Sequence, residues 1–265
     1  VQSGTSNVTN IAFGFTRTFK YWGLFLGHIA GQLTLLFFLM FPFLKNEKQN
    51  MKTISRDNVK LALKENKSFP LYSAPMGVLN LFSVDVLIYT FNLFFSTTMV
   101  GLYSNANKVI NYPLNLISQS FMSVFYQKIS ETQKKLKLYI ISYFSNLTLA
   151  TIMLIPVILW GEELFSFFLG QEWEMAGSIA KFLAPLTITS FAMRSVSNIF
   201  ALTRKNKTLL IWQFLYLLLI IAVIYISKSS HFEILLLNIS IFGSAMYIYL
   251  AITGYFILKK NYENN

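Results

Sequence analysis

Two long apolar segments follow one another in the middle of the sequence, at about residues 70–95 and 99–126, with only the polar turn 96–98 between them. Each is long enough to cross a bilayer, because about 20 helical residues span the hydrocarbon layer. Within a bilayer every backbone polar group must find its hydrogen-bond partner inside the protein, which a helix provides along its own length. The pair therefore predicts two transmembrane helices joined by a tight turn.

Neither segment is uniformly apolar, because polar side chains recur along each at helical spacing. They are Asp85, Tyr89, Asn92 and Ser96 in the first segment, and Ser104, Lys108, Asn111, Asn115 and Ser118 in the second. A polar group facing lipid without a partner costs several kcal/mol, so these stripes must face protein or a water-filled cavity. Two explanations fit: a path for a solute, or contacts between helices in which Asp85 and Lys108 neutralise each other.

A third stripe occurs in the apolar segment 175–202, where a helical face is shared by Thr187, Ser190, Arg194 and the pair Ser197/Asn198. A charged residue at mid-span costs about 2.5–3.5 kcal/mol on insertion scales, so Arg194 needs a polar partner. Its guanidinium stays protonated and presents a planar fork that suits phosphate oxygens. Two explanations are open for these buried charges. Arg194 contacts an anionic substrate, or Asp85 forms a structural ion pair with Arg194 or with Lys108.

The remaining apolar segments give seven full spans, at 22–44, 70–95, 99–126, 138–160, 175–202, 208–227 and 232–258, plus a partial one at 1–18. Of the 22 Lys and Arg residues, 16 lie in four connections or tails: 45–67, 127–137, 203–207 and 259–260. The positive-inside rule places these on the cytoplasmic side, together with the C-terminus, and the acidic stretch Glu162–Glu174 outside. The sequence therefore predicts an all-α, polytopic membrane helix bundle.

Composition excludes several classes of protein. The chain is 54% hydrophobic and 12% charged, and its net charge of +11 lies mostly between apolar segments, which argues for a membrane and against nucleic acid. There is no cysteine, the two histidines (His28 and His231) lie in separate segments, and no Gly-rich phosphate loop is present. We therefore predict no metal site, no cofactor and no enzymatic activity.

Two blocks of sequence resemble a known family, the oligosaccharide flippases. These are the O-antigen and capsular polysaccharide exporters of the multidrug/oligosaccharidyl-lipid/polysaccharide superfamily. The first block comprises Pro70, Ser73, Pro75, Asp85, Gly101, Tyr103, Ala106, Lys108 and Pro113, and the second comprises Gly170–Gly177 and Ala184–Leu186. The resemblance covers most of the chain, but its motifs are diffuse patterns.

The resemblance implies a twelve-helix transporter of two six-helix lobes, of which this chain is an N-terminally truncated part. Residues 1–44 would then be the end of the N-terminal lobe, 45–69 a basic cytoplasmic linker, 70–258 the C-terminal lobe and 259–265 a cytoplasmic tail. Pro113 and Pro156 interrupt predicted helices and permit kinks. In transporters such kinks can act as hinges, and Pro113 is the candidate hinge, although a static bend explains these prolines at least as well.

The function that the resemblance implies is translocation of an undecaprenyl-diphosphate-linked oligosaccharide across the bacterial inner membrane by alternating access. The product would serve O-antigen, capsular or exopolysaccharide synthesis, with membrane lipids, a polysaccharide polymerase and glycosyltransferases as partners. An ion-coupled multidrug or cation exporter is the first alternative, but it would favour an acidic cavity, against which Lys108 and Arg194 argue. A membrane glycan polymerase, an acyltransferase or a scaffold are further alternatives.

Overall fold

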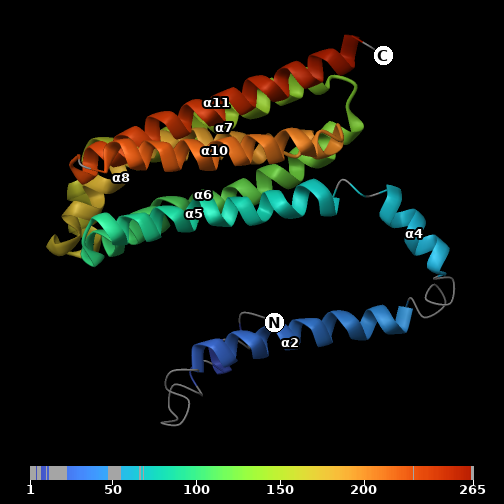
Figure 1. The fold of residues 1–265 in the computed structure, drawn as a ribbon, viewed down its shortest axis with the longest axis horizontal. Helices are drawn as coiled ribbons and strands as arrows, with labels where there is room; N and C mark the ends of the chain where they lie inside the picture. The colour runs from blue at the N-terminus through green and yellow to red at the C-terminus, as the bar shows by residue number, and fades with distance from the viewer. Residues whose placement is uncertain are drawn as a thin grey trace. The chain divides into compact units, whose positions relative to one another are not determined.

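The computed structural model describes residues 4, 7–9, 11, 23–46, 55–65, 67, 69–228 and 230–263, and within them every regular element is a helix (Figure 1). The elements are α2 (Gly23–Asn46), α4 (Arg56–Glu65), η2 (Phe69–Ser73), α5 (Ala74–Phe94), α6 (Thr97–Glu131), α7 (Lys135–Leu169), η3 (Gln171–Trp173), α8 (Glu174–Val196), α9 (Ile199–Leu202), α10 (Asn206–Ser227) and α11 (Phe232–Glu263). The partial span predicted for residues 1–18 lies largely outside the described residues.

Six stretches of helix are long and apolar enough to cross a membrane: 25–42, 70–94, 135–169, 171–202, 206–227 and 232–260. The predicted fold class, a polytopic helix bundle, is confirmed. The predicted span at 99–126 forms the helix α6, but α6 is not among the six, because its Asn, Ser and Lys residues lower its hydropathy. Its membrane position therefore depends on neighbours that satisfy those polar groups.

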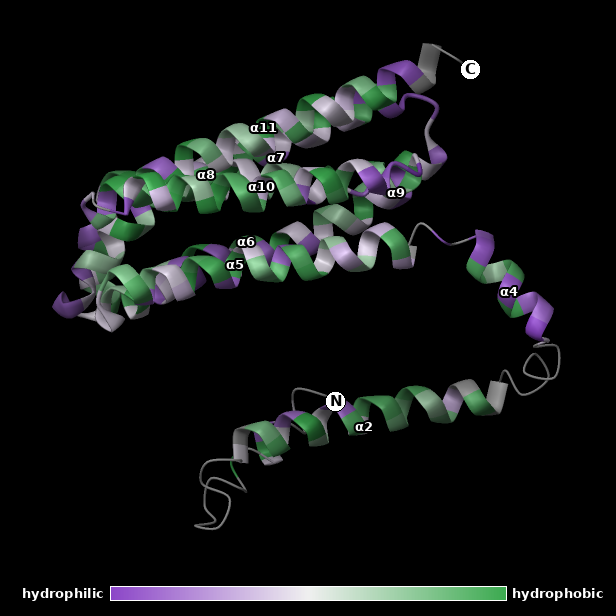
Figure 2. Ribbon diagram, viewed as in Figure 1, coloured by the Kyte–Doolittle hydropathy of each residue, from purple (hydrophilic) through white to green (hydrophobic). Residues whose placement is uncertain are grey.

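The chain divides into two compact units, residues 1–66 and 67–265. The first unit contains α2, which is apolar along its length, and α4, whose residues are all exposed. Figure 2 shows the difference, with α2 largely hydrophobic and α4 largely hydrophilic. The second unit contains all the other helices listed above and the cavity described below.

Helix α8 lies at the centre of the second unit. It packs most extensively against α7 and next against α6 and α11, while α10 packs against both α11 and α5. Most of its side chains are buried, including Phe191, Ala192 and Met193, which are at most 1% exposed. By contrast the outer helices expose large apolar side chains such as Leu93, Leu116 and Ile226, as expected of a lipid-facing surface.

The close packing of α7 and α8 depends on two glycines that face each other, Gly161 and Gly177. A Cβ atom on Gly177 would lie 2.1 Å from the carbonyl oxygen of Gly161, and one on Gly161 would lie 2.8 Å from that of Gly177. Small residues at such crossings let two backbones touch, which is a common way for membrane helices to associate. Next to the crossing, Lys181 Nζ donates to Glu162 Oε1 at 3.1 Å and ties the same two helices together.

The second unit has two chemically different ends. The α6–α7 turn, the α9–α10 turn and the end of α11 lie at one end (Figure 1), with Lys128, Lys134, Lys135, Lys137, Arg204 and Lys205. We call it the basic end. The α7–α8 turn and the start of α11 lie at the opposite end, with Glu162, Glu163, Glu172, Glu174 and Glu233, and we call it the acidic end. Figure 2 shows hydrophilic colours gathered at both ends and hydrophobic colours between them.

Candidate functional site

The second unit contains a partly open cavity of about 610 Å³ between α5, α6, α8, α10 and α11. The size falls within the range of small-molecule sites, about 300–1,000 Å³. Its lining combines amides, hydroxyls, three aromatic rings of α10 and α11, and one charged side chain. The polar and aromatic members are Asn80, Ser83, Tyr103, Asn107, Asn111, Asn115, Thr187, Ser190, Arg194, Ser197, Trp212, Gln213, Tyr216 and Tyr247.

One wall of the cavity is a row of three asparagines on α6, which we call the asparagine ladder: Asn107, Asn111 and Asn115. They lie four residues apart, so they stack on one face of the helix over about 12 Å. Asn111 Nδ2 donates to the side-chain oxygen of Asn107 at 2.9 Å and to its backbone carbonyl at 3.0 Å. The ladder is thus a continuous strip of amides along the cavity.

Arg194 closes the ladder at its end nearer the basic end of the unit. Its Nη1 donates a hydrogen bond to Asn115 Oδ1, which connects α8 to α6 across the cavity. Arg194 is half-buried and lines the cavity, and it is the one charged side chain among the described lining residues. A guanidinium has five donors, so this contact leaves others for an anionic ligand.

The wall formed by α10 and α11 is aromatic. Trp212 stacks on Tyr216 with ring centroids 5.3 Å apart, and Tyr247 packs against both rings at 5.0 and 5.7 Å. Trp212 Nε1 donates to the backbone carbonyl of Met246 at 2.9 Å, so the indole is fixed to the neighbouring helix. Trp212 and Tyr216 are 6% and 9% exposed, whereas Tyr247 is only half-buried, so Tyr247 offers most of the open ring surface.

Buried polar contacts hold the remaining helices around the cavity. Gln213 Nε2 on α10 donates to Ser83 Oγ on α5 at 2.9 Å. In α8 the backbone N–H of Leu186 donates to Ser240 Oγ of α11 at 3.1 Å, directly after Pro185, which has no N–H to give. These contacts satisfy polar groups that lipid could not satisfy, and they set the distance between the cavity walls.

The structure brings six of the predicted stripe residues together in this cavity, namely Asn111, Asn115, Thr187, Ser190, Arg194 and Ser197. The other predicted residues do not line it. Lys108, Asp85 and Asn92 are exposed, Ser104 and Asn198 are half-buried, and Ser118 is buried in α6. Pro113 is exposed within α6, which continues through it. A role for these residues in transport stays a prediction.

Neither ion pair that offered a structural explanation for Asp85 is formed within the described residues. The salt bridge there joins Lys181 to Glu162, and Arg194 bonds to an amide instead of a carboxylate. Whereas α6 continues through Pro113, helix α7 bends at Trp160 (φ −129°, ψ 32°), one turn beyond Pro156.

Sequence reasoning missed Asn107 and the aromatic wall. Asn107 could have been predicted from the sequence, because the four-residue spacing of Asn107, Asn111 and Asn115 places them on one helical face. Trp212, Tyr216 and Tyr247 had none, since aromatic residues are common in spans whichever way they face.

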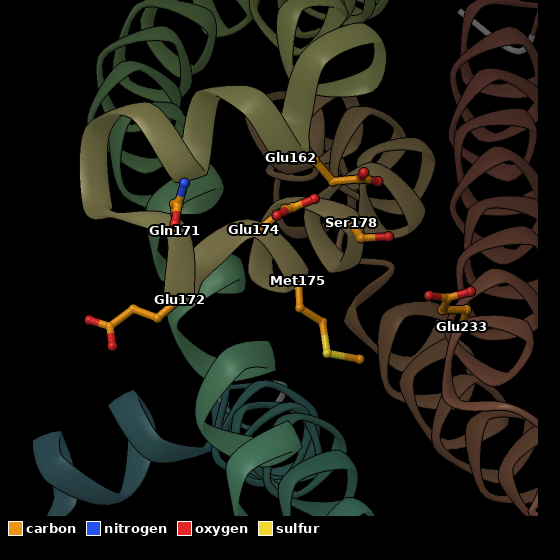
Figure 3. Close-up of a pocket in the computed structure, with 7 residues that line it drawn as sticks. All are labelled: Glu162, Gln171, Glu172, Glu174, Met175, Ser178 and Glu233. Atoms are coloured by element: carbon orange, nitrogen blue, oxygen red, sulfur yellow. The ribbon is translucent and has the colours of Figure 1, made fainter.

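A second pocket, of about 450 Å³, lies at the acidic end between the α7–α8 turn and the start of α11. It is lined by Glu162, Gln171, Glu172, Glu174, Met175, Ser178 and Glu233. Figure 3 shows that the carboxylates do not converge on one point, with Glu172 directed away from Glu233. In the described part of the chain, no group of three or more His, Cys, Asp or Glu side chains could hold a metal ion. The cavity of the asparagine ladder is therefore the better candidate site.

Comparison with known proteins gives one match. The sequence model of a family described as "Polysaccharide biosynthesis protein" matches residues 5–177, about two thirds of the chain. No curated protein and no solved structure matches the chain. The matched residues include α5, α6 and α7 and extend to the first residues of α8, so they contain the asparagine ladder but not Arg194 or the aromatic wall.

Proposed function

Because the chain belongs to the polysaccharide biosynthesis protein family, we propose that it translocates an oligosaccharide linked to a polyprenyl diphosphate across a membrane. Its role in polysaccharide synthesis follows from the family, and its architecture is that of a multi-pass membrane protein. Translocation itself, the undecaprenyl carrier, the bacterial inner membrane and alternating access are our proposal.

The observation that carries the proposal is a strip of polar side chains in a cavity within a membrane helix bundle, with Arg194 beside the asparagine ladder. The substrate joins three chemically different parts, a lipid tail, a diphosphate and a glycan. A bilayer can hold the tail, but the diphosphate and the glycan lose their hydration inside it. The free-energy cost of that loss is largest for charged groups. A cavity with one guanidinium and many neutral donors and acceptors replaces that hydration.

Arg194 is the proposed contact for the diphosphate. Guanidinium groups bind phosphate oxygens through two parallel charge-assisted hydrogen bonds, and these are stronger than bonds between neutral groups. The same positive charge disfavours a cationic drug in the cavity, since like charges in a site of low dielectric repel strongly. This argues for a lipid-linked glycan over cation export.

The proposed orientation places the basic end and the C-terminus in the cytoplasm and the acidic end outside, following the positive-inside rule. The substrate would then enter from the leaflet on which it is synthesised. Glycosyltransferases on that side and a polymerase on the other are the proposed partners, and membrane lipids surround the exposed apolar faces.

The test is deletion of the gene, followed by assays of surface polysaccharide and of the lipid-linked repeat in each leaflet. We expect loss of surface polymer and accumulation of the complete repeat on the cytoplasmic leaflet. If the repeat instead reached the outer leaflet but stayed unpolymerised, a membrane enzyme would be the better explanation. Normal polysaccharide would turn attention to drug export.

Complementation then tests the role of the cavity. The gene carrying Arg194→Gln is expected to produce a protein that inserts into the membrane but does not restore surface polymer, because the diphosphate would lose its cationic partner. Arg204→Gln is the matched control, since Arg204 is exposed at the basic end and outside the cavity. Full export by Arg194→Gln would contradict the proposed contact.

A further inference from the structure

The asparagine ladder and the aromatic wall both line the cavity that also contains Arg194, and the diphosphate contact uses neither of them. We propose that Asn107, Asn111, Asn115 and Tyr247 form a binding site for an uncharged sugar residue, the one next to the diphosphate. The proposal rests on the function proposed above and adds to it a class of substrate. It predicts which glycans the protein accepts.

The first argument is the hydrogen-bonding capacity of the ladder. A carboxamide carries two N–H donors and an oxygen acceptor, which suits hydroxyl groups because each hydroxyl both donates and accepts. Internal bonds use only part of this capacity: Asn111 Nδ2 donates to Asn107, and Asn115 Oδ1 accepts from Arg194. Among the described residues, Asn107 Nδ2, Asn111 Oδ1 and Asn115 Nδ2 have no partner. These free groups line the cavity wall on consecutive turns.

The second argument is the ring of Tyr247. Sugar rings have polar edges and less polar C–H faces, so a site that binds one usually needs both amides and a flat apolar surface. Tyr247 supplies such a surface, and packing against Trp212 and Tyr216 fixes its ring. Because Trp212 is itself held by the bond to Met246, the platform is formed before any ligand arrives.

The third argument is charge. Apart from Arg194, the described residues that line the cavity are uncharged amides, hydroxyls, rings and aliphatic side chains. A carboxylate on the sugar would have to give up its hydration, and the one cation nearby is already engaged by the diphosphate. The site therefore favours a neutral sugar over a uronic acid at the first position.

The experiment measures binding to the purified full chain by titration calorimetry, with three probes that share a short, water-soluble prenyl diphosphate. The first carries a neutral disaccharide, the second carries a disaccharide whose first residue is a hexuronic acid, and the third carries no sugar. We expect the wild-type protein to bind the first probe at least tenfold more tightly than either of the others.

Two substitutions remove the proposed sugar contacts. Asn111→Leu keeps the side-chain shape and removes the amide, and Tyr247→Leu removes the ring. Each is expected to weaken binding of the neutral-sugar probe about tenfold or more and to leave the sugar-free probe unchanged. Tyr247→Phe keeps the ring and should keep the preference.

Matched controls use neighbours outside the cavity. Asn105→Leu removes an amide from the same helix, where Asn105 makes the same kind of bond to the carbonyl four residues earlier, that of Gly101. Tyr249→Leu removes an exposed ring from α11, two residues beyond Tyr247. Both controls should bind all three probes as the wild-type protein does, which also shows that such changes leave the fold intact.

The outcomes separate the two proposals. If Asn111→Leu and Tyr247→Leu bound the neutral-sugar probe normally while Arg194→Gln bound all probes weakly, the sugar site would be overturned and the proposed function would stand. Equal loss of the sugar-free probe in the first two variants, or tighter wild-type binding of the hexuronic acid probe, would also overturn it. Failure of the wild-type protein to bind any probe would overturn both.

Discussion

At the crossing of α7 and α8, replacing Gly177 with Ala should destabilise the protein, although helix propensity alone predicts stabilisation. Alanine is a better helix former than glycine by about 1 kcal/mol per residue, so Gly→Ala at an open helical position should stabilise the protein. At Gly177 the added Cβ would instead lie 2.1 Å from the Gly161 oxygen, 2.5 Å from its carbonyl carbon and 2.7 Å from Glu162 Cα. All three atoms belong to the backbone, so no side chain can rotate to make room.

The size of the effect follows from those distances. To reach ordinary contact at 3.4 Å, the two helices must part by about 1.3 Å, the difference from 2.1 Å. Overpacking of this kind costs about 1–3 kcal/mol, and a clash between backbones belongs at the upper end of that range. After the gain in helix propensity, a net loss of about 2 kcal/mol remains. For a chain of this size that corresponds to a fall in Tm of about 4–8 °C.

The assay is thermal unfolding of the purified protein in detergent, with Gly101→Ala as the matched control. Gly101 also lies in a helix, but nothing lies within 4 Å of the Cβ it would gain. We expect Gly177→Ala to melt lower than the wild-type protein and Gly101→Ala to melt at the same temperature or higher. If Gly177→Ala melted as the wild-type protein does, the close approach of α7 and α8 would be refuted.

Two further predictions use other features of the second unit. Gly254→Ala should lower Tm because the added Cβ would lie 2.5 Å from Tyr139 Oη. Adding Tyr139→Phe should recover part of that loss because it removes the oxygen, although it also removes the hydrogen bond to Ala251, worth about 1 kcal/mol. Additive effects of the two substitutions in a double-mutant cycle would contradict this contact. The chain has no cysteine, so single cysteines report topology directly. A membrane-impermeant maleimide should label Glu172→Cys in intact cells and Lys134→Cys only after permeabilisation, and the reverse pattern would invert the proposed orientation.

The helices could be predicted from sequence because their signal is collective. A span needs about 20 apolar residues in a row, and no single substitution hides such a run. Helix α6 was predicted as well, because its polar residues are sparse enough to leave an apolar majority. What hydropathy could not establish is how α6 lies among its neighbours, since that depends on partners far away in the sequence, such as Arg194 for Asn115.

The site was predicted only in part, for a physical reason. A polar residue in a span signals that it avoids lipid, but the signal does not identify what it faces instead. Arg194 and Asn111 share the cavity, whereas Asp85 and Lys108 carry the same signal and are exposed. Aromatic residues give no signal of this kind, because a ring such as that of Tyr247 is as compatible with lipid as with a cavity wall.

The lengths of the helices have a consequence for the surface of the membrane. Helix α6 has 35 residues, while η2 and α5, which run antiparallel to it across a two-residue turn, have 5 and 21. Helix α6 therefore has about nine residues more than η2 and α5 together, a difference in length of about 14 Å. Helix α7, also of 35 residues, begins just beyond it at Lys135. The last turns of α6 and the first turn of α7 carry the exposed side chains of Lys128 and Lys137 at the basic end. In the proposed orientation, an enzyme that delivers substrate on the cytoplasmic side would meet exposed positive charge at this turn.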